Sequence, residues 1–163
     1  MSKPQVSDYL ELIKKYDSLS NGEKASIRRE IEADDLQINP AFYRLIQGTI
    51  FSKSLSQAAR IVYFLPFVKH KVQGKKIGAI FKDKLISERR LFLVMRSEYP
   101  NDLTQLRRLL QQVKPYAVID WSAFGEMLFL WGKTKERSEG SKRRLMQDFY
   151  LSSAPQIQDT TEV

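Results

Sequence analysis

The chain has 163 residues and carries 27 lysines and arginines against 19 aspartates and glutamates, which gives a formal net charge of +8. The absence of cysteine excludes disulfides and thiolate chemistry, and the longest strongly apolar run, residues 61–68, is far shorter than the roughly 20 residues of a transmembrane helix. We therefore expect a cytoplasmic protein that does not enter a membrane, and whose positive charge favours polyanionic partners.

Apolar residues recur at the three-and-four spacing of amphipathic helices throughout the N-terminal half. The predicted helices there cover residues 6–16, a stretch from the cap Asn21 through Ile31, residues 40–47 between Pro40 and Gly48, and a buried helix at 54–69 that Pro66 ends or kinks. A lysine-rich connection at 69–84 follows, with one short helix at 77–84.

The C-terminal half is predicted to contain four short helices separated by tight turns. They are residues 88–99 after Ser87, a helix capped by Asn101 or Asp102 and stopped by Pro115, residues 121–131 capped by Asp120, and residues 142–151 after Gly140 and Ser141 as breaker and cap. No stretch alternates long enough to indicate a strand, so the predicted fold class is all-α.

The basic connection is also the predicted domain boundary. We expect two small helical domains, an N-terminal helical cluster over residues 1–85 and a C-terminal four-helix bundle over 86–152. The polar residues 153–163 are expected to form a flexible tail.

A doubled arginine interrupts the leucine ladder of DLTQLRRLLQQVK at residues 102–114. At about 100° per residue, Arg108 lies almost opposite the apolar face of this helix and Arg107 about 90° round on its flank. We expect neither to be buried. Arg107 is expected to present its guanidinium at a groove, and Arg108 to point away from the bundle.

Positive charge is concentrated in two stretches. Residues 69–84 carry six lysines against one aspartate, and residues 133–144 carry six lysines and arginines against two glutamates. Lys75 and Lys76 become candidate nucleic-acid contacts from this charge alone.

Each of these features also has a purely structural interpretation. A surface arginine is often only a solvated group or the partner of a nearby acid, as we expect for Arg144 with Asp148. His70 is expected in a basic surface loop rather than at a metal. The large side chains that we expect in the core rather than in a base-stacking platform are Trp121, Trp131, Met95, Met127 and Met146.

Nothing in the sequence indicates catalysis. Without cysteine, and with one histidine inside a lysine cluster, no nucleophile–base pair or transition-metal site is indicated, and glycine-rich phosphate loops are absent. We predict a protein that is not an enzyme and uses no cofactor.

Several unusual sequence motifs of this chain occur together in one known family. PAFYRLIQ at 40–47, SQAARIVYFL at 56–65, SERRLFLVMRSEYPNDLTQLRRLL at 87–110, VIDWSAFGEMLFLWGK at 118–133 and RLMQDFYL at 144–151 resemble the CasB family, the small subunit of the type I-E CRISPR surveillance complex Cascade. The likeness covers roughly residues 40–151, whereas the first 35 residues match only in helical character and the basic loop at 70–84 departs from the family.

The resemblance implies an all-α, non-catalytic, two-domain protein that sits as a pair along the guide-RNA filament. Its members help to hold the target strand on the guide and give the displaced DNA strand a basic track. The implied partners are both DNA strands, guide RNA, other Cascade subunits and a second copy of the chain. The nucleic-acid contacts carried over from the family are Lys53, Arg96, Arg108 and Lys133, to which we add Arg107, Lys75 and Lys76.

Two alternatives remain open. Residues 88–112 could form a helix-turn-helix regulator with LRRLL in its recognition helix, although the turn lacks the expected glycine. A basic helical adaptor that binds acidic proteins is the other.

Overall fold

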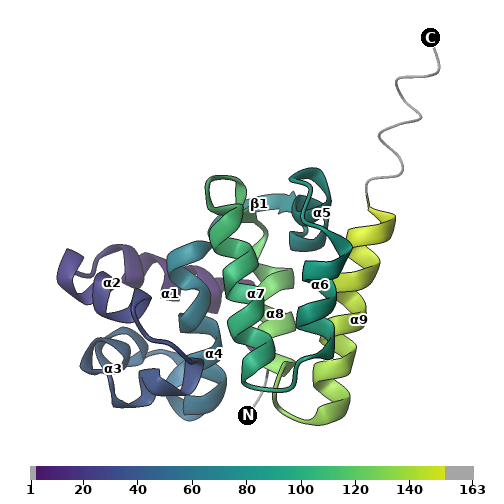
Figure 1. Cartoon of the computed structure of the whole chain (residues 1–163). Helices are drawn as coiled ribbons and strands as arrows, with labels where there is room; N and C mark the ends of the chain where they lie inside the picture. The colour runs from purple at the N-terminus through teal and green to yellow at the C-terminus, as the bar shows by residue number, and fades with distance from the viewer. Residues whose placement is uncertain (1–2, 153–163) are drawn as a thin grey trace.

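The computed structural model describes residues 3–152, and helices dominate them (Figure 1). The all-α fold class is therefore confirmed. The α-helices are α1 (Val6–Asp17), α2 (Asn21–Arg28), α3 (Pro40–Ile46), α4 (Leu55–Phe64), α5 (Ile77–Asp83), α6 (Glu88–Arg96), α7 (Asn101–Gln112), α8 (Trp121–Leu130) and α9 (Lys135–Leu151). Short 3₁₀ segments are η1 (Ala33–Ile38), η2 (Ile50–Lys53), η3 (Leu65–Phe67) and η4 (Lys114–Tyr116). No helix in this part of the chain is long and apolar enough to cross a lipid bilayer.

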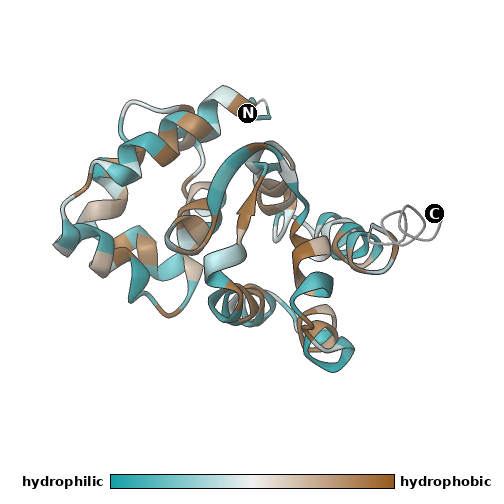
Figure 2. Cartoon of the chain, turned by 90° about the horizontal axis from the view of Figure 1, so that it is seen from above, coloured by the Kyte–Doolittle hydropathy of each residue, from teal (hydrophilic) through white to brown (hydrophobic). Residues whose placement is uncertain are grey.

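The helices form two groups that share one core. Figure 1 shows α1 to α4 on one side and α6 to α9 upright on the other, with α4 beside α7 and α8. Buried side chains of both groups, such as Phe42 and Trp121, belong to one continuous apolar cluster. Brown and teal residues interleave along most helices in Figure 2, as expected of helices that bury one face.

Local capping explains where several helices begin. The Ser87 and Asp120 side chains accept hydrogen bonds from the backbone N–H groups of Arg90 (3.2 Å) and Ser122 (2.9 Å), which confirms both predicted caps. The cap of α2 is Ser20 rather than Asn21. Its hydroxyl accepts from the Glu23 N–H at 3.1 Å while the Glu23 carboxylate accepts from the Ser20 N–H, a reciprocal capping box.

The last helix begins earlier than predicted. α9 starts at Lys135, because the Thr134 side chain accepts from the Arg137 N–H at 3.0 Å, and it runs through Gly140 without a break. Ser141 is not a cap. Its buried hydroxyl donates to the Met127 carbonyl oxygen at 2.9 Å and joins α9 to α8. A residue type that favours helix ends here connects two helices.

A short two-stranded sheet was not predicted. β1 (Lys69–Lys75) pairs in parallel with β2 (Val118–Ile119), with Lys69 opposite Val118 and His70 opposite Ile119. β1 is mostly exposed and β2 has two residues, so neither produces a readable alternation of apolar and polar side chains. The predicted fourth helix also stops at Phe64, and Pro66 lies in η3.

The packing bears on the predicted domain boundary at residue 85. α5 precedes that boundary but packs against α9 of the C-terminal group. Packing therefore favours a division before β1, and the boundary itself stays a prediction. The predicted flexible tail, residues 153–163, lies outside the described residues.

Candidate nucleic-acid interface

One end of the molecule brings together segments that are far apart in sequence. We call this end, the lower edge of the molecule in Figure 1, the basal end. It contains the first residues of α4, α7 and α9 and the last residues of α6 and α8. The Gln57 side chain of α4 donates to the Phe129 carbonyl oxygen of α8 at 2.9 Å. The Arg60 guanidinium lies 5.9 Å from the Tyr99 ring centroid, which joins α4 to the α6–α7 turn.

Gly132 fixes the turn after α8 in this arrangement. Its φ of +87° lies in the left-handed region, and a Cβ added there would approach the Tyr99 ring at 2.8 Å and the Arg60 side chain at 3.3 Å. The turn that carries Lys133 lines one groove with Arg96, and Lys53 lies in η2, directly before the start of α4. The basal end thus collects three of the predicted contacts.

Lys53, Arg96, Lys133 and Arg108 have exposed side chains. None of these four makes an ion pair with a carboxylate of the described residues, whereas six other cations do. Arg96 instead lies 5.8 Å from the ring centroid of Phe92 in the same helix, and Lys133, in the turn after α8, lies 5.9 Å from the Phe129 centroid of α8. Their charges remain available to a ligand.

Lys75 and Lys76 differ in this respect. The Lys75 ammonium lies 2.6 Å from an Asp83 carboxylate oxygen and the Lys76 ammonium 3.7 Å from an Asp148 oxygen. Burial raises the pKa of the Asp148 carboxyl, and the Lys76 ammonium acts in the opposite direction. Both lysines therefore have partners within the protein.

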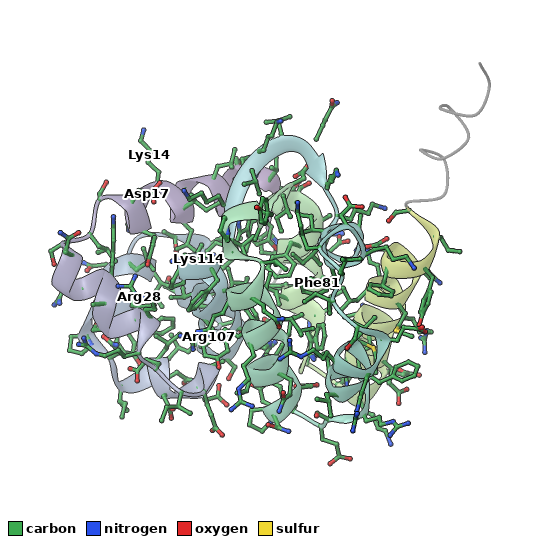
Figure 3. All side chains as sticks on the ribbon, turned by 45° about the horizontal axis from the view of Figure 1, so that its top comes forward. Lys14, Asp17, Arg28, Phe81, Arg107 and Lys114 are labelled. Atoms are coloured by element: carbon green, nitrogen blue, oxygen red, sulfur yellow. The ribbon has the colours of Figure 1, made fainter. Side chains whose placement is uncertain are left out.

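The expectation that Arg107 is exposed is wrong. Its residue exposure is 6%, and its guanidinium donates to the carbonyl oxygens of Glu30, at 2.5 Å, and Arg28. The same group lies 4.1 Å from the Tyr63 ring centroid and 4.6 Å from the Phe67 centroid. Figure 3 shows Arg107 and Lys114 on the side of α7 that faces the N-terminal helices, with Arg28 across from them. The helical wheel locates the apolar face of α7 but not the second surface that covers its flank.

Three structural interpretations are settled by the packing. Trp121, Trp131 and Met127 are buried in the core, as predicted. Arg144 does not pair with Asp148 but with Glu126 of α8, at 3.0 Å. His70 lies half-buried in β1 rather than in a surface loop, and its Nδ1 accepts from the Trp121 N–H at 3.1 Å.

Comparison with known proteins identifies the family. The model of the family CRISPR-associated protein Cse2 matches residues 23–150. The Escherichia coli CRISPR system Cascade subunit CasB is 34% identical over 159 residues, which cover 90% of this chain and 94% of that protein. The chain belongs to the Cse2 family. A chain in the crystal structure of E. coli Cascade bound to a PAM-containing double-stranded DNA target has 33% identity and a TM-score of 0.75, covering 88% of this chain and 97% of that chain.

Two further arginines of this Cse2-family chain are candidate phosphate contacts that the sequence-based predictions did not include. Arg28 and Arg29, at the end of α2, line a groove of about 210 Å³ whose other wall is α7 with Arg108. Both are exposed, and neither pairs with a described carboxylate. The signal was present in the sequence as a second arginine doublet, SIRRE at residues 26–30.

A buried polar cluster supports the basal end. Asp102 is fully buried and accepts from the Trp131 indole N–H at 2.8 Å, while the Lys142 ammonium lies 3.3 Å from the same carboxylate. Asp102 was predicted only as a possible helix cap. It joins the start of α7, the turn after α8 and the middle of α9.

Proposed function

We propose that this Cse2-family chain is the non-catalytic small subunit of a Cascade-type CRISPR complex and stabilises the R-loop. Lys53, Arg96, Arg108 and Lys133 hold the phosphates of the displaced DNA strand. The chain assembles with other Cascade subunits and with a second copy of itself, beside the guide RNA and the target strand. Family membership supports the assembly, and the four exposed cations, which have no carboxylate partner among residues 3–152, support the contacts.

The chemistry of the displaced strand fits such a set of side chains. That strand has arbitrary sequence, so a protein that holds it gains from contacts to phosphates rather than to base edges. Forming an R-loop exchanges one duplex for another of similar stability, so a few backbone contacts decide whether the open state persists. Exposed lysines and arginines on several helices supply such contacts.

The observation that carries the proposal is the difference in partnership between cations. Lys53, Arg96, Arg108 and Lys133 remain exposed and make no ion pair with the described carboxylates, although pairing is common elsewhere on this surface. Unpaired cations keep their full attraction for a phosphate chain.

The buried Arg107 favours this function over a helix-turn-helix regulator. A recognition helix needs a free face to enter the major groove. In α7 one face is buried in the core, and Arg107 on its flank is covered by the α2–η1 connection and by the Tyr63 and Phe67 rings. The exposed residues of α7 are Asn101, Arg108, Gln111 and Gln112, so Arg108 is the one cation on its exposed face.

The test uses the complex assembled with guide RNA. The triple variant Arg96→Ala, Arg108→Ala and Lys133→Ala is expected to shorten R-loop lifetime and to reduce the slope of log K against log salt by ~0.7 per lost phosphate contact. The matched control is Lys14→Ala, Arg89→Ala and Arg90→Ala, which removes the same charge from exposed residues elsewhere. Wild-type retention of target DNA by the triple variant across the salt series refutes the assignment.

A further inference from the structure

The two arginine doublets of this chain face each other across one groove. Arg28 and Arg29 form the wall at the end of α2, Arg108 lies on the α7 wall, and Arg107 extends between them. Glu30 is the carboxylate that lines the same groove. Four guanidinium groups against one carboxylate make this groove strongly cationic.

Arg107 fixes the geometry of the groove. Helix α2 ends at Arg28, and the last carbonyl groups of a helix lack partners within the helix. The Arg107 guanidinium satisfies the carbonyl oxygens of Arg28 and Glu30. Through these two bonds it holds the end of α2 opposite α7, so the side chains of both doublets open into the same space.

One donor in the groove has no acceptor among the described residues. Arg107 is more than nine-tenths buried, and its Nε atom makes no hydrogen bond within the described residues. A buried donor without an acceptor destabilises the folded protein. An anionic oxygen in the groove would meet the side chains of Arg28, Arg29 and Arg108, and the buried Arg107 charge behind them adds to its attraction.

The groove offers donors for a phosphate but no platform for a base. Tyr63 lines it, but the Arg107 guanidinium covers the ring face at 4.1 Å and the Tyr63 hydroxyl donates to the Ile31 carbonyl oxygen at 2.6 Å. The Glu30 carboxylate accepts from the Asn39 side chain at 2.9 Å. Guanidinium groups bind phosphate oxygens through paired N–H donors, irrespective of sequence.

We propose that this groove binds a backbone phosphate of a single DNA strand, with Arg28, Arg29 and Arg108 as ligands and Arg107 as the positioning residue. The proposal rests on the proposed function and extends it to a defined site in the N-terminal half. Lys114, the first residue of η4 after α7, adds a positive charge nearby, since its ammonium lies 6.0 Å from the centroid of the Phe67 ring that Arg107 also contacts.

The first test measures binding of the full-length chain to fluorescent oligothymidine over a salt series. Arg28→Gln/Arg29→Gln is expected to weaken binding and to reduce the salt slope by about 1.4, the value for two phosphate contacts on a single strand. Arg89→Gln/Arg90→Gln is the matched control, because it removes another exposed arginine doublet, from the first turn of α6. Equal slopes for the two double variants would overturn the proposal.

A second readout reports on the groove itself. In the ¹⁵N-labelled wild-type chain, the Nε–Hε resonance of Arg107, assigned by its loss in Arg107→Lys, is expected to shift when oligothymidine is added. The shift is expected to be absent in Arg28→Gln/Arg29→Gln. An Arg107 resonance that does not move at saturating oligothymidine excludes a phosphate at this site.

Failure of this site and failure of the proposed function give different results. The groove variant shares no residue with the triple variant used for R-loop retention. Loss of retention in the triple variant with an unmoved Arg107 resonance rejects the groove alone. A shifted resonance with normal retention in the triple variant supports the groove and rejects the four-residue assignment.

Discussion

The basic β1–α5 segment and the basal end carry similar lysines and arginines but treat them differently. In the β1–α5 segment, Lys75 and Lys76 each lie beside a carboxylate of the same protein. At the basal end, Lys53, Arg96 and Lys133 make no ion pair with a described carboxylate. A cluster of positive charge in the sequence therefore does not by itself predict a binding surface. Neighbouring carboxylates in the fold determine which cations remain available to a ligand.

The largest effect is expected for a cation that the fold uses internally. Arg107→Ala removes two charge-assisted hydrogen bonds and leaves the Arg28 and Glu30 carbonyl groups without them, so we expect a loss of about 3–4 kcal/mol in the free energy of unfolding. Urea denaturation measures it. The control is Arg108→Ala, one residue along the same helix, which should leave stability within about 0.5 kcal/mol.

A loss of about 2 kcal/mol is expected when the cluster beneath the basal end loses its charge. Asp102→Asn keeps the size of the side chain but leaves the Lys142 ammonium, 85% buried at its side chain, without a carboxylate partner. Thermal unfolding should show the loss in Asp102→Asn and not in Glu98→Gln, which changes the same charge at an exposed position nearby. Equal melting temperatures of the two variants would contradict a structural role for this cluster.

A pair of double variants compares the basal end with the β1–α5 segment directly, and the expected difference in DNA binding is about 1 kcal/mol. Lys53→Ala/Lys133→Ala and Lys75→Ala/Lys76→Ala remove the same charge, but only the first pair lacks carboxylate partners in the described structure. The first variant should weaken retention of the displaced strand, measured by its nuclease protection in the assembled complex, and the second should weaken it less. The comparison fails if both variants weaken retention equally.

The smallest effect concerns stability against pH. Burial raises the pKa of the Asp148 carboxyl in the folded state, so the folded protein binds this proton more tightly than the unfolded chain. The Asp148 carboxyl therefore lowers the stability of the protein at pH values above its folded pKa. This destabilisation disappears as the pH falls toward 3.8, the ordinary pKa of an aspartate. Asp148→Asn should raise the melting temperature slightly at pH 7 and not at pH 3.

Glu126→Gln is the control with the opposite sign. Hydrogen bonds from Lys3 and then Arg144 lower the pKa of the Glu126 carboxyl against a cost of burial. Its ionised form contributes stability above the ordinary pKa of 4.5, which is lost as the pH falls through the lower folded value. Glu126→Gln should therefore lower the melting temperature slightly at pH 7. A decrease for both variants would mean that the Lys76 partner outweighs the burial of Asp148.

The sequence was sufficient for most of the helices. Their apolar faces repeat at 3.6 residues, and side-chain caps such as Ser87 and Asp120 act through neighbours three residues away or fewer. Features that depend on distant partners were not predictable. β1 exists because it pairs with a strand far along the chain, and Ser141 is buried because α8 lies against it.

The same distinction applies to the candidate site. Exposure of Arg108 follows from its position opposite the leucines of α7, whereas Arg107 is buried by the end of α2 and by aromatic rings of the N-terminal half. A wheel drawn for one helix contains no information about that second surface. Arg28 and Arg29 could be recognised as a doublet in the sequence, but only the fold places them across a groove from Arg108.

Helix α8 is fastened to the N-terminal half at both of its ends. At the upper end the Trp121 indole donates to the Val68 carbonyl oxygen at 3.2 Å, and at the basal end Gln57 donates to Phe129. A helix held twice along its length resists both sliding and hinge opening, so the distance from the α2–α7 groove to the basal end is fixed by the fold. A single strand that contacted both the α2–α7 groove and the basal end would therefore span a fixed number of nucleotides between them.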